Sequence, residues 1–160
     1  MSYNYSGGEI IKIAIGEEID AIAFYKAAME MDQPSHVKDV FHFLLHEEEK
    51  HLNILEEEIF PLFNQPPFEW EDEDEISSYL CSTGKSGVFT EGVKGVDFVK
   101  THQDPKEITE FAIGMEKKAI EFYKKVETAS SGTGKEAIKR IIEEEATHIH
   151  KLNEVRKNLA

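Results

Sequence analysis

One twelve-residue stretch occurs twice in this chain, as AIGEEIDAIAFY at residues 14–25 and as AIGMEKKAIEFY at residues 112–123. The two copies are identical at 8 of 12 positions. A second pair, LLHEEEKHLNIL at 44–55 and IIEEEATHIHKL at 141–152, shares a pair of glutamates and a histidine three residues after the second of them. Self-similarity of this kind indicates a duplicated structural unit. We therefore interpret the chain as two helical hairpins of one design.

Apolar residues recur three or four positions apart in these stretches, which is typical of amphipathic helices. Helix-start signals, a capping side chain three residues before a glutamate, occur at Ser6, Asp104 and Thr133, and Ser35 is a weaker start for a fourth helix. The prediction is an all-α, four-helix bundle of two pseudo-symmetric hairpins, forming a single domain over residues 1–160. Its helices are expected at about 7–31, 35–60, 104–130 and 134–158.

A long connection, residues 61–103, separates the second helix from the third. A connection of this length in a compact domain needs either its own packing or a path from one end of the bundle to the other. We expect a crossover along the bundle that contains a short helix around DEISSYLCS, residues 74–82. Such a linker also lets hairpins exchange between two chains, so a homodimer, with domain swapping as one form of it, is expected.

The composition excludes several classes of function. The chain has 32 acidic and 18 basic residues and a formal net charge of -14, which disfavours nucleic acid as a partner and favours cations. Its one cysteine, Cys81, excludes an internal disulfide and a four-thiolate metal centre. No apolar stretch approaches the ~20 residues that span a bilayer, and no signal-peptide pattern is present. We expect a cytoplasmic protein without a membrane partner.

Comparison of the two copies of the repeat shows which glutamates occur in both copies and which occur in only one. Glu17 is replaced by Met115 in the second copy, and Glu49 is replaced by Ala146. Six acidic and histidine residues keep both their place in the repeat and a place on an apolar stripe: Glu18, Glu48, His51, Glu116, Glu145 and His148. The other histidines fall off these stripes and are expected at the surface or as satisfied side chains: His36, His42, His46, His102 and His150.

Four carboxylates on the buried faces of a bundle require a compensating charge. Burying each one alone would cost several kcal/mol, and no lysine or arginine occupies the inward positions. Two divalent cations would neutralise the four glutamates, and two imidazoles would complete a ligand set that suits iron or manganese. A glutamate and a histidine three residues apart share one helix face. The sequence therefore predicts a dimetal site formed by the six persistent residues.

This order of ligands, Glu and Glu-x-x-His, a crossover, then the same again, resembles that of the ferritin-like di-iron carboxylate proteins. The AIxxExxAIxFY repeat resembles the rubrerythrin family among them. The resemblance covers all four helices and implies a ferritin-like bundle with one long crossover between helices two and three. It also implies two iron ions, with manganese or zinc as alternatives. Glu48 and Glu145 would be the bridging carboxylates and Glu18 and Glu116 the terminal ones, with one histidine per metal.

The same family resemblance implies a role for two tyrosines. Tyr25 and Tyr123 follow the terminal glutamates by seven residues, and so lie on the same helix faces. They resemble the tyrosines that hydrogen-bond to the metal-binding carboxylates in that family. Their alternative role is that of amphipathic core aromatics.

Two departures from the family limit what the resemblance implies. Rubrerythrins typically carry a four-cysteine, rubredoxin-like iron site that supplies electrons, and this sequence has one cysteine, so an external donor such as a rubredoxin-like protein is expected. The peroxide-reducing members have an additional glutamate one turn after the helix-three ligand, and Ala119 stands at that position. We therefore expect His51 to stay bound in both oxidation states, and a slower reaction with peroxide.

Three functions remain open at this point. The first is an oxidoreductase that reduces peroxide or dioxygen, the second an iron-binding or ferroxidase protein without an organic substrate, and the third a di-iron hydroxylase with an apolar pocket beside the metals. Because both halves supply the same residues, the two ions are expected to have nearly equivalent ligands.

Gly16 and Gly114, which match in the repeat, are expected at places of close packing.

Overall fold

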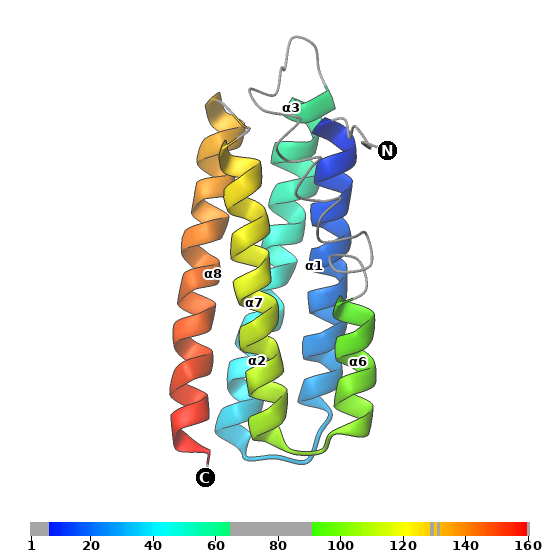
Figure 1. The fold of residues 1–160 in the computed structure, drawn as a ribbon, viewed down its shortest axis with the longest axis vertical. Coiled ribbons are helices and arrows are strands. Elements are labelled where there is room, and N and C mark those ends of the chain that lie inside the picture. The colour runs from blue at the N-terminus through cyan, green and yellow to red at the C-terminus, as the bar shows by residue number, and fades with distance from the viewer. Residues whose placement is uncertain (1–6, 65–90, 129, 131, 160) are drawn as a thin grey trace.

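Every element in the described part of the chain is a helix. The computed structural model describes residues 7–64, 91–128, 130 and 132–159, and its four long helices run side by side (Figure 1). In chain order the elements are α1 (Gly7–Met29), α2 (Ser35–Asn53), the π-helix η1 (Ile54–Ile59), α3 (Phe60–Asn64), α6 (Glu91–Thr101), α7 (Pro105–Thr128) and α8 (Gly132–Asn158). The predicted all-α class is confirmed.

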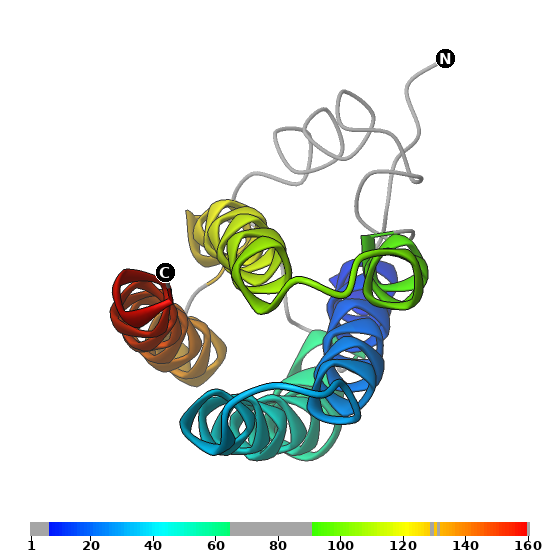
Figure 2. The same ribbon diagram turned by 90° about the horizontal axis from the view of Figure 1, so that it is seen from below.

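Each predicted hairpin is a pair of neighbouring helices. α1 packs against α2, and α7 packs against α8, while α2 also contacts α8 across the bundle. The view along the bundle shows α6 beside α1 (Figure 2). α6 falls within the predicted crossover 61–103 and is a helix that the sequence analysis did not assign. The short helix expected at 74–82 lies outside the described residues, and the homodimer stays a prediction.

The ends of the long helices lie close to those expected, and the second helix contains a π-helical segment. α1 ends at Met29 and α7 at Thr128, two residues before the predicted ends. The predicted second helix, 35–60, is helical throughout, but Ile54–Ile59 form a π-helix between α2 and α3. Residues four positions apart, such as the buried Leu55 and Ile59, lie on nearly the same face in an α-helix and in a π-helix. Hydrophobic spacing therefore could not reveal the change.

One predicted helix start can be followed in atomic detail. The backbone N–H of Lys106 donates a hydrogen bond to Asp104 Oδ1 at 3.0 Å, and Pro105 is the first residue of α7. This is the N-cap geometry that the sequence predicted. Ser6 lies outside the described residues. Thr133 lies inside α8, which begins at Gly132, where a φ of 62° favours glycine.

A polar layer divides the hydrophobic core into two clusters. One cluster includes Ile10, Leu55, Tyr123 and Ile138, and the other includes Phe24, Phe41, Ile108 and Leu152. α1, α7 and α8 each contribute to both clusters, and a buried glutamate separates the two contributions. α2 contributes to the second cluster and its continuation η1 to the first, with Glu48 between them. The predicted interruption of every apolar stripe at its middle is confirmed. The fold therefore places four carboxylates at one level of the bundle.

The close packing expected around Gly114 is wrong. A Cβ atom at this position would meet nothing within 4 Å, and the residue is exposed. A crowded glycine is found instead at Gly95 in α6, where a Cβ atom would lie 2.8 Å from Phe24 Cδ2 and 3.0 Å from Phe111 Cε1. This glycine lets α6 approach α1 and α7 closely. The corresponding expectation for Gly16 stays a prediction.

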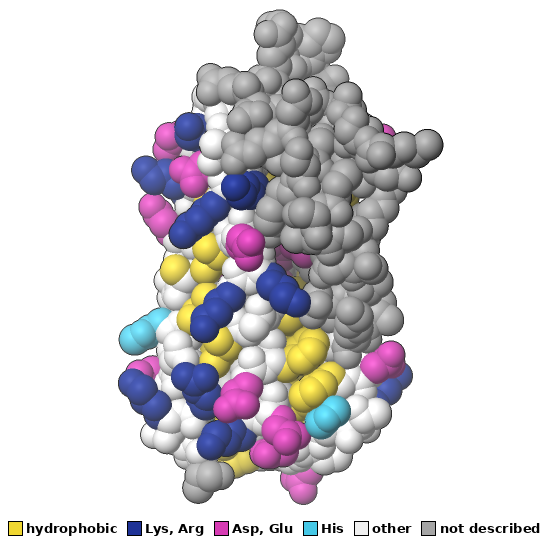
Figure 3. All heavy atoms as spheres, viewed as in Figure 1, with side chains coloured by type: hydrophobic (Ala, Val, Ile, Leu, Met, Phe, Trp, Pro, Cys, Tyr) yellow, Lys and Arg dark blue, Asp and Glu magenta, His cyan; other side chains and the backbone are white. Residues whose placement is uncertain are grey.

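The surface carries charges of both signs. The face drawn in Figure 3 mixes lysine and arginine with acidic side chains and leaves apolar side chains exposed among them. The acidic side chains are therefore not distributed uniformly over this face. Among the described helices, none has the length and apolar character needed to cross a membrane.

Candidate metal centre

The structure brings all six predicted site residues together in the polar layer. α1 supplies Glu18, α2 supplies Glu48 and His51, α7 supplies Glu116, and α8 supplies Glu145 and His148. Each of these residues is at most 3 % exposed. They are held inward because each occupies a position that is otherwise apolar along its helix. Four helices thus contribute a single buried cluster of carboxylates and imidazoles.

The cluster divides into two groups that share two glutamates. One group consists of Glu18, Glu48, His51 and Glu145, and the other of Glu48, Glu116, Glu145 and His148. In each group the candidate ligand atoms lie within 4.8 Å of one another. Glu48 and Glu145 belong to both groups, which is the arrangement expected of bridging carboxylates. The groups can therefore hold a pair of metal ions, and the role of each ligand stays a prediction.

The two histidines turn the same nitrogen toward the carboxylates. His51 Nδ1 lies 3.1 Å from Glu48 Oε2 and 3.3 Å from Glu145 Oε1. His148 Nδ1 lies 2.9 Å from Glu145 Oε2 and 3.5 Å from Glu48 Oε1. The two rings stack with their centroids 5.4 Å apart. Each group therefore offers one imidazole Nδ1 together with carboxylate oxygens.

Two buried tyrosines connect the hairpins at this level. The Tyr25 hydroxyl of α1 donates to Glu116 Oε1 of α7 at 2.5 Å, and the Tyr123 hydroxyl of α7 donates to Glu18 Oε1 of α1 at 2.5 Å. Burial and the adjacent Glu116 raise the pKa of Tyr25, so that its hydroxyl keeps its proton and remains a donor at neutral pH. Each hairpin thus holds a carboxylate of the other.

Burial and neighbouring charged groups together shift the pKa values of the buried carboxylates. Burial and the charge of Glu116 raise the pKa of Glu145 to about 8, and burial and Glu48 raise that of Glu18 well above its usual value. Burial would also raise the pKa of Glu116, but the contacts with Glu145 and His148 lower it to about 2. In the metal-free protein at neutral pH, protons therefore compensate part of the buried negative charge.

The histidines contribute positive charge in the metal-free protein. Burial alone would lower the pKa of His51, but its contacts with Glu145 and Glu48 raise it to about 12. The neighbouring carboxylates also raise the pKa of His148. A metal ligand must be a neutral imidazole, so metal binding would release these protons. The site is therefore one where protons and metal ions compete.

The unsatisfied atoms of the cluster fit metal ions. Among the described residues, the buried atoms without a hydrogen-bond partner include Glu18 Oε2, Glu145 Oε2 and both ring nitrogens of His148. The 2.9 Å contact between Glu145 Oε2 and His148 Nδ1 is an ion-pair distance without the geometry of a hydrogen bond. Buried polar groups in this state are costly and uncommon. All four atoms belong to predicted ligands, and carboxylate oxygen with imidazole nitrogen is a donor set for iron, manganese or zinc. Divalent cations would satisfy the two glutamate oxygens and His148 Nδ1 and offset the buried charge, whereas His148 Nε2 lies on the other side of its ring.

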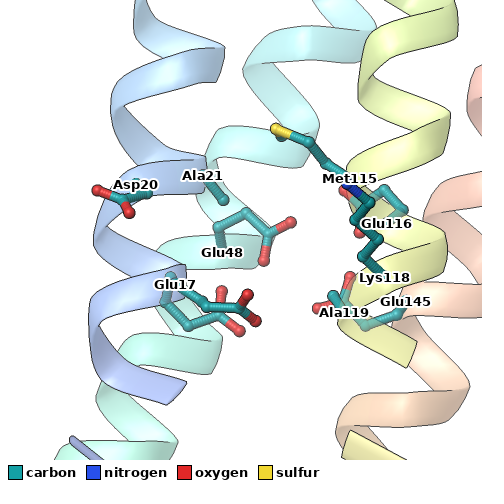
Figure 4. A pocket seen from close by; sticks show the side chains of 10 residues that line it. Glu17, Asp20, Ala21, Glu48, Met115, Glu116, Lys118, Ala119 and Glu145 are labelled. Atoms are coloured by element: carbon teal, nitrogen blue, oxygen red, sulfur yellow. The ribbon is translucent and has the colours of Figure 1, made fainter. Parts of the chain in front are cut away.

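A small cavity reaches the cluster between α1 and α7. Its lining consists of Glu17, Glu18, Asp20, Ala21, Glu48, Met115, Glu116, Lys118, Ala119 and Glu145 (Figure 4). Ala21 and Ala119 are matched positions of the repeat, and both face this cavity. The space open to the centre of a water-sized sphere is about 40 Å³. One water molecule needs roughly 10–15 Å³ on this scale, so the cavity holds only a few atoms.

One contact of the cluster was missed by the sequence analysis. Glu144 Oε2 lies 2.7 Å from His51 Nε2, although Glu144 is 46 % exposed. The repeat carried a signal for it, because Glu144 and its counterpart Glu47 are the first members of the shared glutamate pair. The apolar stripe identifies buried positions only, so it does not indicate Glu144.

The histidines that the sequence placed off the site do lie elsewhere. His42 and His46 are exposed on α2, with their Nε2 atoms 3.0 Å apart, and His46 Nδ1 lies 3.2 Å from Glu49 Oε2. His102 stacks on Phe98 near the end of α6.

Comparison of the chain with protein-family models, with curated proteins and with solved structures found no significant match.

Proposed function

We propose that this chain is a non-haem dimetal carboxylate protein of the ferritin-like, rubrerythrin-like type. In this proposal the six buried residues would hold two iron ions, which would supply the electrons that reduce peroxide or dioxygen, and an external donor protein would replace those electrons. The observation that carries it is the pair of four-residue groups that share Glu48 and Glu145. Two ions that share two carboxylates are held close together, and a close pair suits a two-electron reaction. The helix order, with a connection between α2 and α7, supports the ferritin-like topology.

The residues of the chain have separate tasks in this proposal. The four glutamates and two histidines hold the ions, and Tyr25 and Tyr123 fix the carboxylates of Glu116 and Glu18 before an ion arrives. The iron pair, when bound, supplies two electrons, so that one hydrogen peroxide and two protons give two water molecules. An external donor then returns the two electrons.

The size of the cavity favours a small oxidant over an organic substrate. The space beside the cluster, about 40 Å³, accommodates peroxide or dioxygen but no drug-sized or lipid-like molecule. Its lining includes acidic side chains from α1, Glu17 and Asp20, and a lysine from α7, Lys118. An apolar substrate pocket, as a hydroxylase requires, is not found at this place among the described residues.

A second candidate is an iron-handling or ferroxidase protein, in which ferrous iron is itself the substrate. Glu17 and Asp20 at the cavity favour this candidate, because carboxylates near an opening attract cations. The two candidates differ in stoichiometry. An oxidoreductase retains two irons per chain and turns over peroxide repeatedly, whereas an iron-handling protein takes up further iron after the first two have been oxidised.

The test uses protein purified without oxygen and loaded with ferrous iron. We expect two iron ions per chain, and oxidation of the loaded protein on stopped-flow mixing with hydrogen peroxide or dioxygen. Glu48→Ala should lose the bound pair, because this glutamate belongs to both groups. The side chain of its neighbour Glu49 is about half-exposed on the same helix and belongs to neither group, so Glu49→Ala serves as the matched control and should keep both ions. A wild-type chain that binds no iron, or that binds a metal inert to both oxidants, would overturn the proposal.

A further inference from the structure

The two histidines of the cluster have different surroundings on the side away from the carboxylate groups. His51 Nε2 lies 2.7 Å from Glu144 Oε2, on the neighbouring helix α8. His148 Nε2 is buried and has no hydrogen-bond partner among the described residues. The sequence repeat predicts equal surroundings for these two imidazoles. The two groups therefore have matching sets of candidate ligands, but the surroundings of their histidines depart from the repeat.

One exchange between the halves, Lys50 for Thr147, accompanies this difference. Glu47 is the counterpart of Glu144, and its Oε1 atom lies 2.6 Å from the ammonium of Lys50, one turn along α2. The counterpart of Lys50 on α8 is Thr147, whose hydroxyl donates to the backbone carbonyl of Glu143. A lysine thus engages Glu47 on its own helix, whereas Glu144 extends across to His51. The two halves share the glutamate but not its partner.

We propose that Glu144 is a positioning residue for His51 and makes the two metal positions unequal; this rests on the proposed metal centre. A carboxylate only accepts hydrogen bonds, so its contact keeps a proton on His51 Nε2. With that proton fixed, the lone pair of the neutral ring is at Nδ1, the atom that lies among Glu18, Glu48 and Glu145. A carboxylate in this place also increases the basicity of the ligand.

The consequence is an order of metal binding. The group that contains His51 and Glu18 has an oriented imidazole, whereas the group that contains His148 and Glu116 does not. The first ion should enter the His51 group, and the second should bind more weakly and exchange faster. Loss of an outer carboxylate of this type typically weakens metal binding about 10–100-fold. If Glu144 only formed an ion pair that stabilises the fold, its removal would have almost no effect on metal affinity, because the residue is half-exposed.

The experiment measures zinc binding and the histidine ring protons in four proteins. Zn²⁺ is the probe because it is diamagnetic and accepts the same ligands. The reference protein carries only His46→Ala, so that the exposed His42–His46 pair binds no additional ion, and is otherwise wild type. Glu144→Ala, Glu144→Gln and the control Glu47→Ala are each made in this background. Competition with a chelator gives the two zinc affinities, and nitrogen-15 spectra of labelled histidine report the exchange of each Nε2 proton with solvent.

In the reference protein we expect two zinc ions of unequal affinity and one ring proton, that of His51, protected from exchange. Glu144→Ala should weaken the tighter ion by 10–100-fold and remove the protection, whereas Glu47→Ala should change neither. Glu144→Gln, whose amide oxygen still accepts, should restore the protected proton. Equal effects of Glu144→Ala and Glu47→Ala in a chain that binds two ions would overturn this inference alone. Absence of zinc and iron binding in the wild type would overturn the proposed function itself.

Discussion

At the scale of single residues, the buried carboxylates depend on donors from the opposite hairpin. Tyr25 and Tyr123 each donate a hydroxyl hydrogen bond to a glutamate that lies about 100 positions away in the sequence. Neither bond connects neighbours on a helix, so both contribute to how the hairpins face each other. A carboxylate that keeps a donor also keeps one orientation, which matters more for a ligand than for a packing residue.

Tyr25→Phe should therefore weaken both folding and metal binding. The change removes one hydroxyl and leaves the Glu116 carboxylate without this donor, at a cost of about 1–3 kcal/mol in the free energy of unfolding. Urea denaturation of the metal-free protein measures that cost, and zinc titration measures the accompanying loss of affinity. Tyr123→Phe acts on Glu18 in the same way and is the matched variant. If both variants bind zinc as tightly as wild type, the tyrosines serve only as core aromatics.

The sequence was sufficient to predict the six candidate ligands because their burial conflicts with their charge. A glutamate repeated at the centre of an apolar stripe has few physical explanations, and the repeat excluded Glu17 and Glu49 as alternatives. Glu144 could not be selected in this way. Its contact with His51 joins two helices across 93 positions, and its half-exposed place resembles that of any surface glutamate.

At the scale of elements, the features that the sequence did not predict are local departures from regular spacing. η1 replaces the end of the second predicted helix, although the matched residues of α8 stay α-helical. α6 was missed because its glycines, among them Gly95, lower its helix propensity. Packing against α1 compensates for this deficit, and such tertiary contacts are not visible in a propensity pattern.

The glycines of α6 and α7 give opposite predictions for the same substitution. Gly114→Ala should stabilise the protein, because the new methyl group meets nothing within 4 Å and alanine is favoured in a helix by about 1 kcal/mol. For a chain of this size the midpoint of thermal unfolding should rise by roughly 2–4 °C. Circular dichroism melting curves of the metal-free protein provide the measurement. A lower midpoint would show that Gly114 has a packing role after all.

Gly95→Ala should destabilise the protein although the residue is also in a helix. Its methyl group would lie 2.8 Å from Phe24 Cδ2, so that α6 or the phenylalanine must shift. Overpacking of this kind typically costs about 1–3 kcal/mol, more than the gain in helix propensity. The same melting curves test it beside Gly114→Ala. A stabilised Gly95→Ala protein would mean that α6 is not held closely against α1.

At the scale of the whole molecule, two apolar clusters enclose a charged layer, and this layer determines how stability responds to pH. Glu145 has a pKa of about 8 in the folded protein against 4.5 for an ordinary glutamate, so the folded chain holds a proton between these values that the unfolded chain has lost. His51, with a pKa of about 12 against 6.5, acts in the same direction above pH 6.5. Glu116 acts in the opposite direction, but only below pH 4.5.

The metal-free protein should therefore lose stability as the pH rises from 6.5 to 8. Each group that binds one proton more in the folded state lowers the free energy of unfolding by up to about 1.4 kcal/mol per pH unit. Zinc-loaded protein should behave differently, because the ions replace these protons and bind more tightly as the pH rises. The stabilisation by zinc, measured as the difference between urea unfolding curves with Zn²⁺ and with a chelator, should grow across this interval.

A variant with a non-titrating side chain isolates the contribution of one carboxyl group. In Glu145→Gln the amide takes the place of the protonated acid, so the metal-free variant should lose less stability than wild type between pH 6.5 and 8. The variant should also gain less from zinc, since Glu145 belongs to both ligand groups. Metal-free wild type that becomes more stable over this interval would contradict the assignment, because it would mean that the buried layer holds fewer protons when folded than when unfolded.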